Sequence, residues 1–302
     1  MNILILGASG FVGGHLSRAL LAEGHAVTGI GTSRNPVLAS HEDFIWISAD
    51  TTRPGPWQAA VPRADVIVNL AGRTIFKRWS RSYKKQLYDS RILTTRNLVA
   101  GLPPDSKAVF FSTSAAGYYG FRGDEVVTED AAAGDDFLAA TSVDWENEAR
   151  LAARKGARVV LMRFGIVLAA DGGALGKMAP AFKLFAGGPL GTGRQWFPWI
   201  HMADIIGAIG FLVDRDDLDG PFNFTAPEPV RNGRFAKLLG QVLKRPAVMP
   251  APAFAIRLIM GEMGGALLNG QRAVPDRLKQ AGYRFRFPDA GQALSDLYGR
   301  GD

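Results

Sequence analysis

The 302-residue sequence contains no cysteine, which excludes disulfide bonds, thiolate catalysis and cysteine-ligated metals. Long apolar stretches are also missing, since no window approaches the roughly 18 uninterrupted apolar residues of a membrane-spanning helix. The N-terminus enters an apolar run directly, without the basic leader and cleavage site of a secreted protein. We therefore expect a cytoplasmic protein with no membrane partner.

Histidine is scarce, while positive charge is in excess. The four histidines are scattered, so we expect no metal site. Lysine and arginine number 35 against 28 aspartates and glutamates, a formal net charge of +7. The densest basic run, residues 77–85, forms either a solvated helix face or a nucleic-acid site. Because no longer basic run exists, we favour a phosphate-bearing cofactor or substrate and expect no nucleic-acid partner.

The first fourteen residues organise the chain. Residues 2–6 are a short apolar run that predicts a buried strand, and Gly7, Gly10 and Gly13 follow at intervals of three. Such glycines allow a sharp turn and the close approach of a phosphate, and the amides that begin the next helix would face an anion. A turn without a ligand is the alternative. We favour dinucleotide binding, with contacts from Gly7, Ser9, Gly10, Phe11 and Val12.

Residues 26–31 predict the second strand, and the residues after it indicate which dinucleotide binds. NAD sites carry an acidic residue here for the ribose hydroxyls, whereas NADP sites carry small polar and arginine residues for the 2′-phosphate. This chain has Ser33 and Arg34 at that point and no carboxylate before Glu42. We expect NADP(H), and the alternative is that Arg34 is an exposed loop arginine.

Further motifs point to one family. The strand predicted over residues 64–70 ends in Asn69, Leu70, Ala71 and Gly72, and a helix over residues 82–100 follows. With the GxxGxxG loop and the C-terminal stretch 250–287, these motifs resemble the extended short-chain dehydrogenases/reductases. The similarity is strongest to an atypical, cell-division-inhibitor-like branch of the NAD(P)-dependent epimerase/dehydratase family with a short C-terminal module.

The resemblance implies an α/β fold with a doubly wound Rossmann-type parallel sheet and a smaller C-terminal α/β lobe. We expect an NADP-binding domain over residues 1–168 and a substrate-covering lobe over residues 169–302, with residues 199–226 returning to the main sheet.

The resemblance also implies cofactor contacts beyond the glycine loop. Asp50 follows the strand predicted over residues 44–48 and is either at the adenine amino group or a solvated loop residue. Gln86 and Arg91 lie on the helix that passes the crevice, and Arg91 either contacts NADP or forms a salt bridge on the helix. Close backbone contacts are expected at Leu70, Ala71, Gly72 and Ile166.

Reaction chemistry is expected after the strand predicted over residues 107–111, because active sites of open α/β sheets lie at the carboxyl ends of strands. By resemblance, Thr113 or Ser114 holds the substrate oxygen. The superfamily's proton donor is a tyrosine of a YxxxK helix, but the helix near residues 137–146 has neither tyrosine nor lysine. We predict Tyr118 as the acid/base, with Arg91 supplying positive charge. The alternative is that Tyr118 and Tyr119 line the pocket without proton transfer.

The later segments connect the two parts. Glycines between residues 172 and 193 predict a flexible passage into the lobe. The aromatic run 196–199 beside Arg194 either grips a flat or anionic ligand or packs at a domain junction. Asp204 is expected to cap the next helix, and His201 to hold the fold. The Leu and Met stripe over residues 258–268 is expected in the core or on a lid.

Together these features predict an NADP(H)-dependent oxidoreductase or epimerase that acts on a small polar, sugar-like molecule, as a monomer or homodimer. The alternative is a non-catalytic NADPH-binding sensor or interaction protein, which the missing YxxxK supports.

Overall fold

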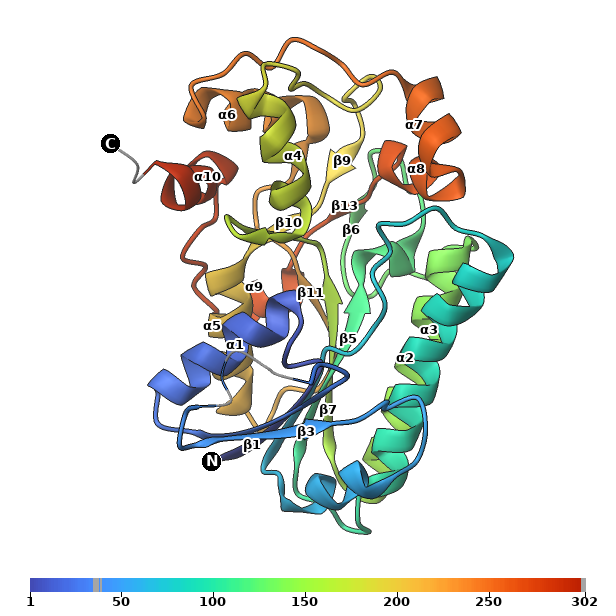
Figure 1. Cartoon of the computed structure of the whole chain (residues 1–302), viewed down its shortest axis with the longest axis vertical. Helices are drawn as coiled ribbons and strands as arrows, with labels where there is room; N and C mark the ends of the chain where they lie inside the picture. Colours follow the sequence, from blue (N-terminus) through green and yellow to red (C-terminus); the bar gives the residue numbers. More distant parts are fainter. Residues whose placement is uncertain (35–37, 39, 300–302) are drawn as a thin grey trace.

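The computed structural model describes residues 1–34, 38 and 40–299. A seven-stranded sheet with the order β11-β7-β5-β4-β1-β2-β3 runs through its lower half, and all neighbouring strands are parallel (Figure 1). The strands are β1 (Asn2–Leu6), β2 (Ala26–Gly31), β3 (Phe44–Ser48), β4 (Val66–Asn69), β5 (Val109–Ala115), β7 (Arg158–Phe164) and β11 (Gly220–Phe224). This sheet confirms the predicted doubly wound fold.

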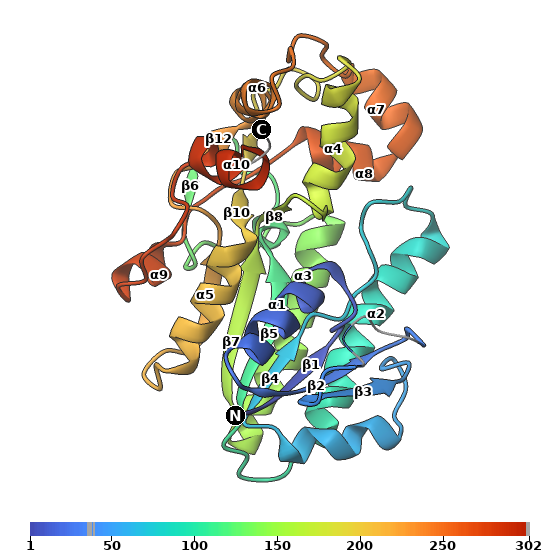
Figure 2. The same ribbon diagram turned by 60° about the vertical axis from the view of Figure 1, so that its left-hand side comes forward.

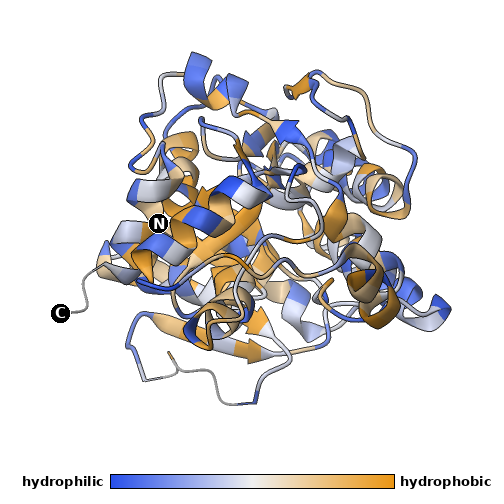
Figure 3. Cartoon of the chain, turned by 90° about the horizontal axis from the view of Figure 1, so that it is seen from above, coloured by the Kyte–Doolittle hydropathy of each residue, from blue (hydrophilic) through white to orange (hydrophobic). Residues whose placement is uncertain are grey.

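Helices cover both faces of the sheet (Figure 2). One face carries α1 (Phe11–Ala22) and α5 (Met202–Val213), and the other carries α2 (Arg81–Gly101) and α3 (Phe137–Arg150). Strand side chains alternate, so Ile3 and Ile5 pack on the α1 face while Leu4 and Leu6 pack on the α2 face. The apolar strands lie between more polar helices in Figure 3.

The order of the strands places a crevice between β1 and β4. From β1 the chain builds β2 and β3 on one side, and from β4 it builds β5, β7 and β11 on the other. Connections that leave neighbouring strands in opposite directions open a crevice at their carboxyl ends, where such folds bind ligands.

A lobe lies beyond the carboxyl ends of the strands (Figure 1). Its helices are α4 (Gly173–Lys183), α6 (Asn232–Val242), α7 (Ala253–Met260), α8 (Glu262–Leu268) and α10 (Ala290–Tyr298), and α9 (Asp276–Gln280) lies beside the sheet. Short strand pairs complete it, namely β8 (Ile166–Ala169) with β10 (Trp199–His201), β9 (Trp196–Phe197) with β12 (Val230–Arg231), and β6 (Val126–Val127) with β13 (Arg272–Ala273). Phe182, Phe235 and Leu294 belong to its own apolar core. Within the described residues, no helix has both the length and the apolar character needed to cross a bilayer.

Two expectations about the extent of helices and strands were wrong. The predicted flexible passage contains the helix α4, because good helix formers such as Leu175, Lys177 and Met178 follow its first glycines. Strand β5 continues to Ala115, so Thr113 and Ser114 lie within the strand instead of after it.

Asp204 does not cap α5, which was also predicted wrongly. The cap is His201, whose Nδ1 accepts a hydrogen bond from the amide of Ala203 (3.1 Å). Asp204 is buried in the first turn, where its carboxylate accepts from the amides of Arg286 (2.6 Å) and Phe287 (3.1 Å). It therefore anchors the C-terminal segment to α5, while the prediction that His201 holds the fold is confirmed.

Candidate active site

The glycine loop packs directly against its neighbours. Gly7 has φ +83°, and its amide donates to the carbonyl of Ile30 (2.7 Å). A Cβ atom on Gly7 would lie 2.9 Å from the carbonyl carbon of Leu70, and one on Gly13 would lie 2.2 Å from the Gly7 oxygen. The loop, the first helix and the β4 turn are thus held together at distances that only glycine permits.

The start of α1 leaves room for an anion. Gly10 is the N-cap and offers no side-chain acceptor, and no other described residue accepts from the first-turn amides of Phe11 and Val12, so these amides can meet a ligand. A Cβ on Gly10 would touch just one neighbouring atom, the Gly7 oxygen at 3.0 Å. Ser9 is exposed beside it. A pyrophosphate fits this combination of open space and helix N-terminus.

Arg34 lies after β2, where a 2′-phosphate is expected. The Nε1 of Trp46 donates to the carbonyl of Ser33 (3.0 Å), which fixes the backbone at this point. Arg34 is exposed, and it forms no ion pair with any residue that the structure describes. Its charge is available to an anion.

Asp50 is exposed just after β3. Its carboxylate accepts hydrogen bonds from the hydroxyl (2.6 Å) and amide (3.1 Å) of Thr52, and these bonds hold its pKa below the usual range. Both bonds use Oδ1, and Oδ2 accepts no hydrogen bond from any residue that the structure describes.

The β4 turn meets α2 through Arg91. The guanidinium donates to the carbonyls of Leu87 (3.0 Å) and Arg73 (3.1 Å), and a Cβ on Gly72 would lie 3.4 Å from its central carbon. Burial lowers the pKa of Arg91 to about 10, so it stays charged at neutral pH. Within the described part of the chain it has no carboxylate partner, so the predicted alternative of a helix salt bridge was wrong.

The remaining cofactor candidates differ in placement. Ala71 follows the turn, and its amide donates to the side chain of Asn69 (3.2 Å). Gln86 is exposed on α2. Ile166 begins β8, and its amide donates to the carbonyl of Pro198 (2.6 Å), which places it at the crossing into the lobe.

The lobe touches both sides of the crevice, which the sequence did not reveal. The ring of Phe11 lies against Gly172 and Gly173 at the start of α4, and His15 pairs with Asp171 (3.0 Å). At the opposite side, Lys84 of α2 pairs with Glu262 of α8. These contacts join residues far apart in sequence, so no local sequence pattern predicts them.

The two predicted hydroxyls at the end of β5 are already engaged. Thr113 donates to the carbonyl of Asn69 (2.8 Å). Ser114 is buried and donates to the carboxylate of Glu146 on α3 (2.7 Å), which also forms a two-pronged ion pair with Arg163 (2.8 and 2.9 Å). To donate a hydrogen bond to a substrate oxygen, Thr113 or Ser114 would first have to give up its present acceptor.

Tyr118 and Tyr119 have different surroundings in the short 3₁₀ helix Ala116–Tyr119. Tyr119 is fully buried, donates to Asn223 (2.6 Å) and accepts from Arg163 (3.0 Å). Burial raises the pKa of Tyr119 to about 12, so it stays protonated. Tyr118 is partly exposed, and its hydroxyl has no hydrogen-bond partner among the described residues. Of the two, Tyr118 has the free phenol.

The cation beside Tyr118 is Arg163, whose guanidinium carbon lies 3.6 Å from the ring centroid. Arg91, the predicted cation, instead lies 5.2 Å from the ring of Trp145 on α3. Trp145 donates from its indole to Thr95 on α2 (2.8 Å). Helix α3 therefore faces α2 with a tryptophan and offers neither a tyrosine nor a lysine.

The aromatic run before α5 mainly packs. Phe197 stacks on Phe235 at 4.4 Å, and Trp199 is buried in the lobe core. Trp196 lies between the guanidinium groups of Arg231 (4.6 Å) and Arg272 (4.8 Å). The cations at this ring are thus two residues from other segments instead of the predicted Arg194.

Comparison with known proteins gives a consistent result. Residues 3–224 match the NAD dependent epimerase/dehydratase family, and residues 251–297 match a domain of unknown function, DUF1731. The chain is 38% identical over 300 residues to the chloroplastic "Epimerase family protein SDR39U1 homolog" of Arabidopsis thaliana, covering 97% of this chain and 86% of that protein.

Two solved structures are similar over almost all of the chain. One is the human epimerase family protein SDR39U1 (isoform 2) with NADPH, with 32% identity, a TM-score of 0.88, and coverage of 99% of this chain and 100% of that one. The other is the nucleoside-diphosphate sugar epimerase of Corynebacterium glutamicum, with 30% identity, a TM-score of 0.77, and coverage of 99% of this chain and 58% of that one.

Proposed function

Because the chain belongs to the NAD dependent epimerase/dehydratase family, we propose that it is an NADP(H)-dependent oxidoreductase or epimerase acting on a small polar, sugar-like substrate. The NADPH named with the human protein and the sugar substrate class named for the Corynebacterium protein support the proposal. The observation that carries the catalytic part is the hydroxyl of Tyr118, which has no hydrogen-bond partner among the described residues, beside Arg163 and just after the carboxyl end of β5.

The cofactor would be held by residues on both sides of the β1–β4 crevice. The amides around Gly10, Phe11 and Val12 bind the pyrophosphate, and Arg34 binds the 2′-phosphate. Ser9, Ser33 and Asp50 line the adenosine half, and Leu70, Ala71, Gly72, Gln86, Arg91 and Ile166 line the remainder. Bound NADP(H) supplies hydride chemistry at a substrate carbon.

Tyr118 would hold or move the proton of the substrate oxygen. Its hydroxyl needs no exchange of partners, whereas Thr113 and Ser114 must first release Asn69 and Glu146. The phenol therefore acts as the acid/base, and Thr113 or Ser114 orients the oxygen by accepting or exchanging a hydrogen bond.

The test is consumption of NADPH with a panel of carbonyl compounds and sugar nucleotides. We expect turnover that falls by about 100-fold or more in Tyr118→Phe, with NADPH binding retained. Tyr88→Phe is the matched control, because it also loses one tyrosine hydroxyl, which donates to Asp144 (2.9 Å) away from β5. Turnover equal in both variants would refute the role of Tyr118.

A second function is favoured by one observation. The hydroxyls of Thr113 and Ser114 on β5 are both engaged and α3 lacks the tyrosine–lysine pair, so the fold could hold NADP(H) without reaction. NADPH binding with no turnover on the whole panel would support this cofactor-binding, non-catalytic role.

A further inference from the structure

Helix α7 turns its apolar face outward. Phe254, Leu258 and Ile259 are 75%, 73% and 71% exposed. Leu258 and Ile259 belong to the stripe over residues 258–268 that was expected in the core or on a lid. Among the large apolar side chains of α7 and α8, Ile256 and Met263 are buried. A short helix that exposes three large apolar side chains indicates a binding surface.

Two neighbouring loops extend this apolar surface. Leu184 and Phe185, directly after α4, are 78% and 56% exposed, and Val248 and Met249, before α7, are 74% and 56% exposed. The loops are joined, because the amide of Met249 donates to the carbonyl of Gly187 (3.1 Å). The end of α4, these loops and α7 occupy one end of the lobe, the top of Figure 1, and we call this surface the lobe tip.

The lobe tip lies in a part of the chain without acidic residues. Residues 172–203 and 229–261, which include α4, α6 and α7, contain nine lysines and arginines and no aspartate or glutamate. The rest of the chain then carries 26 basic against 28 acidic residues, so the whole net charge of +7 comes from these two segments. Exposed Lys183 and Arg257 are direct neighbours in sequence of the exposed apolar residues Leu184 and Leu258, so the lobe tip carries positive side chains beside its apolar ones.

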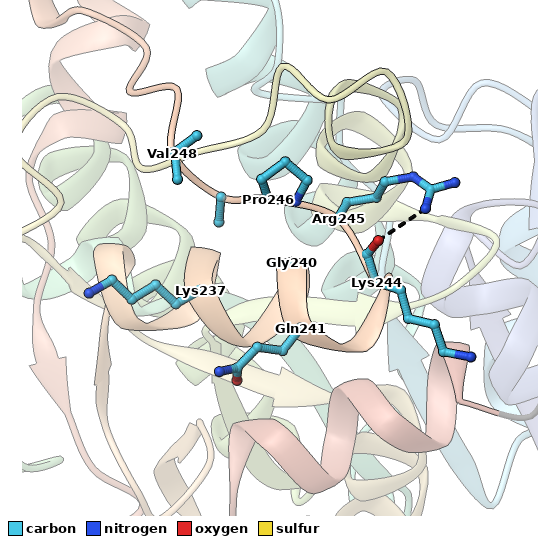
Figure 4. Close-up of a pocket in the computed structure, with 8 residues that line it drawn as sticks. Lys237, Gly240, Gln241, Lys244, Arg245, Pro246 and Val248 are labelled. Atoms are coloured by element: carbon cyan, nitrogen blue, oxygen red, sulfur yellow. Dashed lines mark hydrogen bonds between the residues drawn. The ribbon is translucent and has the colours of Figure 1, made fainter.

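The basic side chains around the lobe tip extend outward and do not converge on a ligand. In Figure 4, Lys237, Lys244 and Arg245 border a shallow hollow on α6 but point away from one another. Arg245 lies 4.8 Å from the ring of Phe185, and Arg257 is exposed on α7 between the apolar residues. This arrangement suits an extended anionic surface better than a small molecule.

The charge decides among the possible occupants. Two copies of this chain meeting at their lobe tips would bring two positive surfaces together, which disfavours self-association. The apolar side chains protrude from a helix and two loops, so they fit an occupant that they can penetrate. Such an occupant has an apolar interior under a negatively charged outer layer. We propose that the lobe tip binds peripherally to a lipid surface that contains anionic phospholipids, in contrast to the sequence-based expectation of no membrane partner.

The test is flotation of the full-length protein with vesicles of phosphatidylcholine alone or mixed equally with phosphatidylglycerol. We expect binding to the mixed vesicles that weakens as salt is raised, and little binding to the neutral ones. Leu258→Ser with Ile259→Ser should weaken binding by about tenfold or more, because both side chains insert. Arg257→Glu should weaken it through charge.

Matched controls lie at the opposite end of the sheet. Ile45→Ser removes an apolar residue that is also well exposed (62%), and Lys107→Glu makes the same charge change at an exposed lysine. Both should bind vesicles like the wild type, and unchanged thermal midpoints verify folding of every variant. Absent vesicle binding, or equal loss in the controls, would overturn the proposal. The proposal would also be overturned if the protein did not bind vesicles but instead associated with itself or bound an acidic protein, and if Leu258→Ser abolished that association.

Discussion

Replacement of Glu146 by glutamine should destabilise the protein strongly. The Glu146 carboxylate is 1% exposed and accepts from Arg163 Nε (2.8 Å) and Nη2 (2.9 Å), from the Ser114 hydroxyl (2.7 Å) and from Arg150 (2.9 Å). Glu146→Gln keeps the size but removes the charge, and it can direct an amide donor at the guanidinium. Arg163 then remains buried without its counter-ion.

Removing one partner of a buried ion pair costs about 3–5 kcal/mol. For a chain of this length about 2 °C is lost per kcal/mol, so the thermal midpoint should fall by about 6–10 °C. Calorimetry and urea unfolding measure the change. Glu148→Gln on the same helix is the control, because its partner Arg96 is mostly exposed and the loss should stay below about 1 kcal/mol.

One outcome would contradict the importance of the buried Glu146–Arg163 pair. Equal losses in Glu146→Gln and Glu148→Gln would show that the buried pair contributes no more than a surface pair. Glu146→Leu combined with Arg163→Met should regain stability relative to Glu146→Gln, because no charge is left buried.

Three further changes have defined outcomes. Arg34→Ala should weaken NADPH binding by about tenfold and NADH binding by less than about twofold, because only NADPH carries the 2′-phosphate; an unchanged affinity ratio in a fluorescence titration would contradict this. Gly13→Ala should destabilise the protein by about 2 kcal/mol and weaken NADPH binding, because the new Cβ would lie 2.2 Å from the Gly7 oxygen. Gly14→Ala is the control, because its Cβ would lie 3.8 Å from the nearest atom, Nη1 of Arg18; it should stabilise the protein by up to about 1 kcal/mol in urea unfolding. Burial lowers the pKa of His201 to about 4, so as the pH falls the imidazole is protonated in the unfolded chain before it is protonated in the folded protein. The free energy of unfolding should therefore fall by about 3 kcal/mol as pH drops from about 6.5 to about 4. His201→Asn should flatten that part of the pH–stability curve.

Much of the sheet could be predicted from local sequence. β1, β2 and β3 are apolar runs that end at glycine or polar residues, and the observed bounds coincide with the predicted ones. The glycine loop could also be predicted, because the contact that requires Gly13 is with Gly7 in the same loop. The contact that requires Gly7 is with Leu70 in the distant β4 turn, which the glycine spacing does not reveal.

The surroundings of the candidate catalytic residue could not be predicted in the same way. Arg163 reaches Tyr118 because β7 pairs with β5, and that pairing joins residues 49 positions apart, such as Ser114 and Arg163. The partner of Ser114 is likewise on a distant helix, α3. Sequence spacing identifies residue types at the strand end but not which hydroxyls are already engaged.

The tail shows a different limit. The apolar stripe of α7 has the composition of a core helix, yet Leu258 and Ile259 are exposed because no other segment of the described chain covers them. Asp204 has the sequence context of a helix cap, but the returning C-terminal segment supplies amides at Arg286 and Phe287 that bind it instead. The periodicity of apolar residues predicts that a helix has an apolar face, but it does not predict which segment covers that face.

The most direct test of NADP(H) binding in the β1–β4 crevice is a calorimetric titration of the wild-type protein with NADPH and with NADH. We expect one saturable NADPH site per chain, with affinity about tenfold or more above that for NADH. Equal affinities, or no binding of either dinucleotide, would contradict the assignment of Arg34 and the glycine loop to NADP(H).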